Sequence, residues 1–179
     1  MIGNDKHYDS IICLLSVSFK ENGDNIDKFH EKKMADGVTR IIKLSFWEHD
    51  RYIPILHVIA NVSNNSEELA TIFMENLVHK ILMAQIKKSM NMYKKSHSLF
   101  DEMSQETVYI QMLKYQTLAA EIIALGGLLK SPKRMEILED LVILDLVAVM
   151  SHPMTDPILL TAICTFALDL FECDELRYN

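Results

Sequence analysis

Short apolar segments at helical spacing, separated by polar joints, are the feature that most constrains how this chain can fold. Apolar residues recur at intervals of three and four positions, as they do along a helix that buries one face. Three such stripes are Ile55, Val58, Ile59 and Val62, then Leu118, Ile122 and Leu125, then Ile163, Ala167 and Leu170. The segments are short, about 8 to 16 residues each. Each segment must therefore bury its apolar face against neighbouring helices.

The joints between these segments carry residues that start helices. The run Asn65-Ser66-Glu67-Glu68 offers an N-cap residue with a carboxylate three positions on. In Ser131-Pro132 and Asp156-Pro157, a capping residue precedes a proline placed for the first helical position. Only five glycines and four prolines occur, fewer than the tight turns of an all-β protein need. We expect one all-α domain over residues 1–179.

Three stretches of the chain are similar to one another. In each, a turn-forming residue (Gly37, Asn76 or Asp140) is followed by a short apolar helix. The first two turns are 39 residues apart, close to the repeat length of helical solenoids, and the next two are 64 apart. The longer interval corresponds to one repeat plus an insertion. We predict an α-solenoid of about three repeats and a partial one, with boundaries near 8–47, 48–88, 105–151 and 152–179 and a helical insertion at about 87–105.

The residues at these repeat positions resemble the armadillo repeat family. Val58-Ile59-Ala60-Asn61-Val62-Ser63 is similar to the end of the family's third helix, and Asp36-Gly37-Val38 to its glycine turn. The resemblance extends from about Ile11 to Glu172, and two-helix HEAT repeats would give some of the same spacing. It implies that stacked third helices line a concave groove, which binds an extended or helical segment of a partner protein.

The resemblance also implies which residues contact that partner. The family's asparagine at the third-helix end often bonds the backbone of an extended peptide, because an amide both donates and accepts. Asn61 fills this position, and its counterparts are Ser18, Gly127 and Asp169. Asn61 equally fits a structural role at a helix end or between repeats.

One helical turn earlier, the nuclear-import members of the family carry tryptophan. This sequence has His57 there, and Leu14, Ile123 and Thr165 at the counterpart positions. A regular ladder of Asn and Trp is missing, so we expect the groove to bind something other than a nuclear localisation signal. His57 joins Asn61 as a candidate partner contact, although a histidine on such a helix is more often simply solvated.

Two other features suggest alternative functions. Lys87, Lys88, Lys94 and Lys95 alternate with Met and Tyr in the insertion, which would suit an acidic partner or nucleic acid. They fit better the solvated face of an elongated second helix, and the net charge of −7 argues against a chain that mainly neutralises phosphates. The end helices 11–19 and 158–171 are strongly apolar, which would suit self-association or capping by another subunit.

The sequence carries no motif for catalysis, a cofactor or a metal. Gly126-Gly127 lacks the spacing of a phosphate-binding loop and is expected to allow close helix packing, and the seven histidines have no metal-ligand spacing. Cys13, Cys164 and Cys173 are expected to be buried free thiols in a reducing compartment. With no apolar run of membrane-spanning length and no secretory signal in this sequence, we expect a non-enzymatic scaffold or adaptor in the cytoplasm or nucleus, with no small-molecule substrate.

Overall fold

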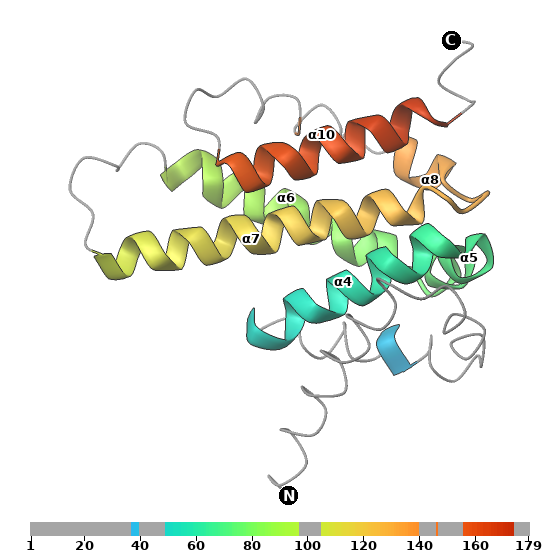
Figure 1. Ribbon diagram of the computed structural model, residues 1–179, viewed down its shortest axis with the longest axis horizontal. Helices are drawn as coiled ribbons and strands as arrows, with labels where there is room; N and C mark the ends of the chain where they lie inside the picture. The colour runs from blue at the N-terminus through green and yellow to red at the C-terminus, as the bar shows by residue number, and fades with distance from the viewer. Residues whose placement is uncertain (1–36, 40–48, 97–104, 140–145, 147–155, 174–179) are drawn as a thin grey trace, which may run out of the picture.

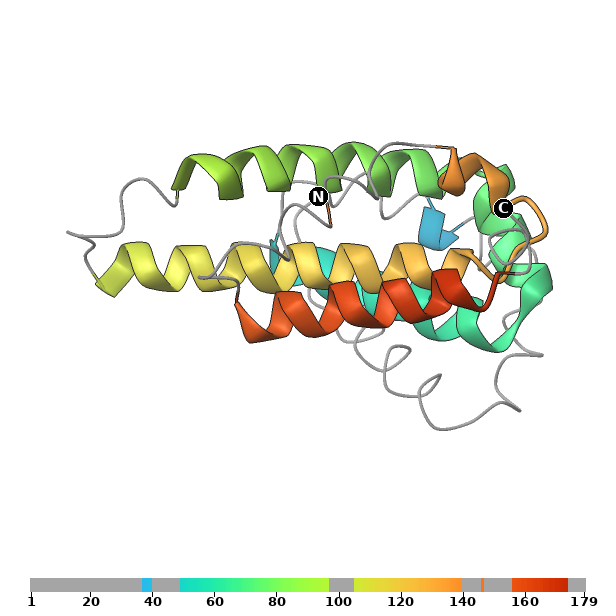
Figure 2. The ribbon, with the colours of Figure 1, turned by 90° about the horizontal axis from the view of Figure 1, so that it is seen from above.

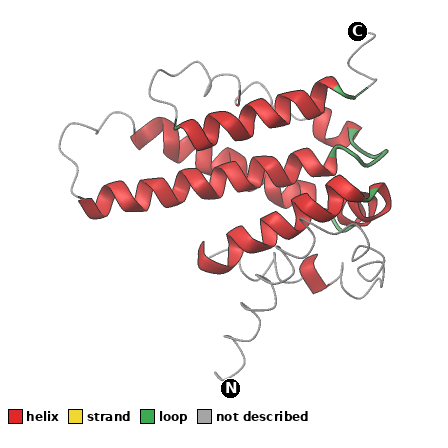
Figure 3. Ribbon diagram, viewed as in Figure 1, coloured by secondary structure: helices red, strands yellow, loops and turns green. Residues whose placement is uncertain are grey.

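A computed structural model describes residues 37–39, 49–96, 105–139, 146 and 156–173. In this part of the chain every regular element is a helix, which confirms the all-α prediction (Figure 3). The helices are α4 (His49–Asn65), α5 (Glu67–Glu75), α6 (Val78–Ser96), α7 (Gln105–Leu128), α8 (Met135–Leu138) and α10 (Pro157–Phe171).

Helices α4, α7 and α10 lie side by side and run in the same direction, with α7 in the middle (Figure 1). Helix α6 runs in the opposite direction and packs on a different side of α7, as the view from above shows (Figure 2). The short helix α5 connects α4 to α6 and contacts both of them and α7. Three parallel helices therefore form one layer, and α7 is the helix that α4, α6 and α10 all contact.

The apolar stripes expected from the sequence are the faces that these helices bury. The four stripe residues of α4 are at most 1% exposed, and Leu118, Ile122 and Leu125 of α7 are at most 2% exposed. On α10, Ile163 and Leu170 are buried and Ala167 is half-buried. All but Ala167 belong to one continuous apolar core. Burial of such side chains contributes about 1.5 to 3 kcal/mol each, so packing rather than helix propensity holds the layer together.

Two of the expected helix starts are confirmed. Ser66 caps α5, since its side chain accepts a hydrogen bond from the backbone N–H of Leu69 at 3.2 Å. The Asp156 carboxylate accepts from the N–H of Ile158 at 2.8 Å and caps α10, whose first turn contains Pro157. Each cap satisfies N–H groups that would otherwise lack a partner in the first helical turn.

The third expected start is displaced. Helix α8 begins at Met135 rather than at Pro132. The Ser131 hydroxyl instead accepts from the N–H of Lys133 at 3.2 Å, and the N–H of Arg134 donates to the carbonyl of Ser131 at 3.1 Å. These bonds close a tight turn that leads from α7 into α8.

Helix lengths and one turn also differ from expectation. Helices α6 and α7 have 19 and 24 residues, which is longer than the segments expected from the sequence, and no proline lies within either helix. Gly37 has helical backbone, so the turn predicted there is not found at that residue. The turn predicted at Asn76 is present: Asn76 caps the end of α5, and Leu77 takes a φ of 62° before α6 begins. Asp140, the third predicted turn residue, lies outside the described residues.

Two adjacent glycines near the end of α7 allow the close contacts within the layer. A Cβ atom at Gly127 would lie 3.0 Å from the backbone oxygen of Ala60 and 3.2 Å from the Cβ of Ser63, both on α4. A Cβ atom at Gly126 would lie 2.7 Å from Oδ2 of Asp169 on α10. The expected packing role of the glycine pair is confirmed.

The two glycines should respond differently to alanine. We expect Gly127→Ala to lower the free energy of unfolding by about 1 to 3 kcal/mol, because the obstructing atom belongs to the α4 backbone and the helices must separate. Gly126→Ala should be neutral or stabilising, because the Asp169 side chain can rotate away and alanine favours a helix by about 1 kcal/mol. Urea unfolding of both variants measures the difference, and equal stabilities would contradict a backbone contact at Gly127.

Candidate binding surface

One face of the layer points away from α6 and is formed by all three parallel helices. On α7, Glu121 contacts Ser89 of α6, whereas Ile123 lies about 200° further round the helix. Ile123 is half-buried, and Met112 and Gln116 on the same side of α7 are exposed. Helix α7 therefore presents one accessible stripe between α4 and α10.

The neighbouring helices present matching stripes. Their exposed or half-buried side chains follow the same spacing of three and four residues. An ion pair between Lys130 Nζ and Glu172 Oε2, at 3.1 Å, joins the stripes of α7 and α10 where the two helices end. We define the layer face as His57, Asn61, Asn64, Met112, Gln116, Ile123, Ile158, Thr161 and Thr165.

The structure brings three of the predicted partner contacts together. Gly127 lies against Ala60 and Ser63, which flank Asn61 on α4, and Gly126 lies against Asp169 on α10. The counterpart positions 61, 127 and 169 are thus neighbours across the layer. Ser18, the fourth counterpart, lies outside the described residues.

These predicted residues differ in what they offer a partner. His57 is exposed and Asn61 is half-buried, so both contribute polar groups to the layer face. Gly127 is buried and has no side chain, so it serves packing alone. Asp169 is half-buried: burial raises the pKa of its carboxyl group, Lys130 opposes that rise, and Glu172 adds to it.

The layer face is rich in uncharged hydrogen-bonding groups. Amides come from Asn61, Asn64 and Gln116, and hydroxyls from Thr161 and Thr165. Each hydroxyl donates to a carbonyl one turn earlier, at 2.8 Å for Thr161 and 3.0 Å for Thr165, and keeps an acceptor lone pair. Amides and hydroxyls of this kind suit the main chain of a bound segment, because they form hydrogen bonds with backbone N–H and C=O groups and do not require a charged partner.

The basic segment lies elsewhere, on α6. The helix continues unbroken through positions 87 to 95, as the interpretation of an elongated second helix predicts. Lys88 is exposed and Lys87 half-buried, and the side chains of Lys94 and Lys95 lie outside the described residues. Since α6 packs on the opposite side of α7, these lysines are not part of the layer face.

Two cysteines are described, and one contradicts expectation. Cys173 is buried, and its Sγ donates to the carbonyl of Asp169 at 3.4 Å. Cys164 is exposed, because its position on α10 faces away from α7, so its predicted burial is wrong. Cys13 lies outside the described residues.

A buried polar cluster between α4, α6 and α7 was missed in the sequence. Glu121 is 2% exposed, and Ser89 donates to its Oε2 at 3.5 Å, while Tyr52 faces it from α4. Burial raises the pKa of Glu121 to about 8, and hydrogen bonds from Tyr52 and Ser89 oppose the rise. Burial and the nearby Glu121 also raise the pKa of Tyr52. The available signal was a single carboxylate inside the apolar run from 118 to 129.

This cluster makes stability depend on pH. With its pKa raised from 4.5, Glu121 contributes stability that is fully present below pH 4.5 and is lost as pH rises to about 8. We expect Glu121→Gln to raise the free energy of unfolding at pH 9 by about 2 to 4 kcal/mol and to change it little at pH 5. Urea unfolding across this range tests the prediction, and a pH-independent difference between the two proteins would contradict it.

A second buried polar residue, His79, connects α6 to α8. His79 is fully buried, and its Nε2 lies 3.1 Å from Oε2 of Glu136. A carboxylate only accepts, so Nε2 carries the proton, and Nδ1 has no hydrogen-bond partner among the described residues. Burial lowers the pKa of His79, and Glu136 only partly opposes this. The histidine is therefore neutral at pH 7.

His79 should destabilise the fold at acid pH. The pKa of His79 in the folded protein lies below the ordinary 6.5. The stability that the neutral imidazole contributes is therefore present above pH 6.5 and is lost as pH falls through that lowered pKa. We expect His79→Gln, which keeps an N–H donor for Glu136, to flatten the decline in unfolding free energy between pH 6.5 and 5. An unchanged slope in that window would show that His79 is not the titrating group.

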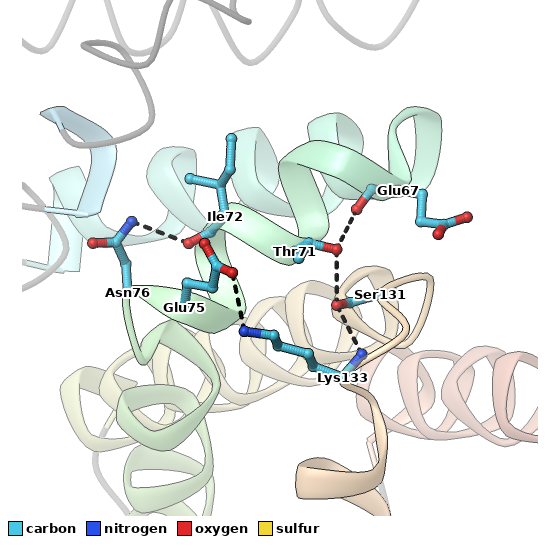
Figure 4. A network of polar contacts seen from close by, with 7 residues as sticks. All are labelled: Glu67, Thr71, Ile72, Glu75, Asn76, Ser131 and Lys133. Atoms are coloured by element: carbon cyan, nitrogen blue, oxygen red, sulfur yellow. Dashed lines mark hydrogen bonds and ion pairs between the residues drawn. The ribbon is translucent and has the colours of Figure 1, made fainter.

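Polar contacts also join α5 to the turn after α7 (Figure 4). The Thr71 hydroxyl lies 3.1 Å from the Ser131 hydroxyl, and Lys133 Nζ donates to Glu75 Oε1 at 3.0 Å. The Asn76 amide donates to the carbonyl of Ile72 at 3.0 Å and closes the end of α5. These contacts position the short helix α5 across the C-terminal end of α7.

Within the described ranges, no three or more His, Cys, Asp or Glu side chains form a group that could hold a metal ion. No helix described by the structure combines the length and hydropathy needed to cross a bilayer. Comparisons of the chain with protein-family models, curated proteins and solved structures found no match.

Proposed function

We propose that this protein is a non-enzymatic interaction module of the armadillo type, a scaffold or adaptor that binds an extended or helical segment of a partner protein on the layer face. The single observation that carries the proposal is the parallel stacking of α4, α7 and α10, which aligns equivalent residues of three helices on one surface. Partner contact comes from apolar side chains together with a few amide anchors, among which Asn61 and His57 are the first candidates.

The order of the helices supports the armadillo-type arrangement. Between α4 and α7 the chain forms a short helix, α5, and then α6, which packs antiparallel to α7. A second short helix, α8, follows α7, and α10 then takes the next place in the layer. The succession of a short helix (α5), a second helix (α6) and a layer helix (α7) corresponds to the three-helix unit that the armadillo resemblance implies.

The chemistry of the layer face favours a peptide segment over a nucleic acid. Apart from His57, its side chains are neutral amides, hydroxyls and apolar groups, and Lys130, a cationic neighbour among the described residues, is paired with Glu172. Nucleic-acid affinity rests largely on unpaired Lys and Arg that neutralise phosphates. Uncharged donors and acceptors flanked by apolar groups are instead suited to main-chain recognition.

The partner contact can be tested with a defined ligand. Random peptides of about 15 residues displayed on phage are selected on the intact protein, and the Kd of one selected peptide is measured by fluorescence anisotropy. We expect His57→Ala combined with Asn61→Ala to weaken binding about tenfold or more, because loss of one or two hydrogen-bonding groups costs about 1 to 3 kcal/mol. The thermal midpoint should change little.

A matched control lies on α6. Lys80→Ala combined with Asn91→Ala also removes one basic and one amide side chain, both exposed on a helix behind the layer. Peptide affinity should be unchanged in this variant. Equal affinity of the intact protein and the His57/Asn61 variant for every selected peptide would overturn the proposal.

A further inference from the structure

Helix α8 is a single helical turn that lies beside the start of α6 (Figure 2). It buries one apolar side chain, that of Ile137, and no side chain caps its N-terminal end. A helix this short is not stable by itself, because ordering the first helical turn is unfavourable. Helix α8 therefore depends on its contacts with the rest of the protein.

A hydrogen bond from α6 is one of these contacts. Nε2 of His79 donates to Oε2 of Glu136 at 3.1 Å, and Glu136 is the second residue of α8. His79 belongs to the first turn of α6 and its side chain is fully buried, whereas the side chain of Glu136 is 48% exposed. The bond thus joins a buried imidazole to a helix at the surface of the protein.

The surroundings of His79 suit a neutral imidazole and not a charged one. Protonation would add a donor at Nδ1, which is buried and has no hydrogen-bond partner among the described residues. A cation in the first turn of α6 would also face the positive end of the helix dipole, and that turn contains no acidic residue. A charged His79 therefore disfavours any arrangement that keeps it buried.

The charged groups around His79 offset this only in part. Glu136 of α8 attracts a charged imidazole, and Lys80, the next residue of α6, repels it. Glu75 of α5, a helix that packs on α6, is already paired with a lysine of the turn before α8, at 3.0 Å. Glu121 of α7 contacts α6 ten residues further along, about 15 Å from His79 along the helix axis. Glu136 is thus the main attractive partner, and water partly screens its half-exposed carboxylate.

We propose that His79 makes α8 an acid-sensitive latch: protonation of the imidazole releases α8 from α6 while the layer of α4, α7 and α10 stays folded. Release of α8 exposes one buried apolar side chain of that helix, whereas moving α6 would expose at least five, between Val78 and Met90. Local opening of α8 is therefore the easier way to bring the charged imidazole into contact with water.

Contacts with α5 determine where this movement ends. The Thr71–Ser131 and Glu75–Lys133 contacts hold the turn at 131–134 against α5. Helix α8 can therefore move about this turn while α7 keeps its position. No residue of α8 belongs to the layer face, so the latch does not depend on peptide binding there.

Amide hydrogen exchange of the full chain at pH 7.5 and 5.5 tests the latch. Rates are expressed as protection factors, which remove the pH dependence of exchange in an unfolded chain. The lower pH should reduce the protection of residues 135–138 about three- to tenfold, because a histidine takes up its proton below about pH 6.5 and one proton changes an opening equilibrium by at most about tenfold per pH unit. Protection in α7 and α10 should stay unchanged.

Two variants assign the effect to His79. His79→Gln keeps an N–H donor for Glu136 but takes up no proton, so the protection of α8 should be the same at both pH values. Glu136→Gln keeps an acceptor but lacks the charge that attracts a protonated imidazole, so α8 should lose at least as much protection as in the intact protein. His57→Gln, which removes an exposed histidine of α4, is the matched control and should behave like the intact protein.

Several results would overturn the latch. Equal protection of α8 at both pH values in the intact protein is one, and a loss that persists in His79→Gln is another. A loss that extends equally to α7 and α10 would show global unfolding, and a smaller loss in Glu136→Gln would assign the effect to protonation of that carboxylate. Circular dichroism at pH 7.5 shows whether each variant is folded, and the intact protein and Glu136→Gln carry the test even if His79→Gln is not.

Discussion

The close approach of α7 to its two parallel neighbours is the contact on which the rest of the structure depends. Gly127 lets the backbone of α7 approach that of α4, and Gly126 leaves room for Asp169 of α10. A larger residue facing α4 would separate the helices, and a gap in a close-packed interior loses the dispersion contacts along its whole length. This approach also determines the register of the three helices, because it places positions 61, 127 and 169 next to one another. The layer face follows from that register.

Two ionisable groups lie in the interior that this packing creates. Glu121 and His79 are both buried, but burial shifts their pKa values in opposite directions, since it disfavours the charged form of each. The carboxyl group is most favourable for the fold at acid pH, and the imidazole at neutral and higher pH. Each group also connects different helices: Glu121 lies between α4, α6 and α7, and His79 links α6 to α8. A polar contact of this kind forms only when the helices pack in one register. It therefore favours that arrangement of the helices over other arrangements that would bury a similar apolar area.

The parallel layer gives each of its helices edges that differ in chemistry. One edge of each layer helix contributes to the layer face, whose neutral amides and hydroxyls suit a peptide main chain. Another edge packs against the next helix in the layer. The two kinds of edge differ in chemistry because they correspond to different positions in the same repeating pattern. Amide and hydroxyl side chains lie beside apolar ones where α4, α7 and α10 face outward together, whereas the edges buried between these helices are mainly apolar.

Much of the secondary structure was predictable from the sequence alone, because periodicity and capping are local properties. The buried stripes of α4, α7 and α10, the caps at Ser66 and Asp156 and the packing role of Gly126-Gly127 all follow from residues close together in the chain. The exposure of Cys164 and the burial of Glu121 did not follow, because an apolar helix face shows that burial is needed and not which neighbour provides it. Only the tertiary structure, by placing α7 between α4 and α10 with α6 behind it, decided which side of each helix is covered. That choice depends on contacts between residues far apart in sequence, which no local pattern contains.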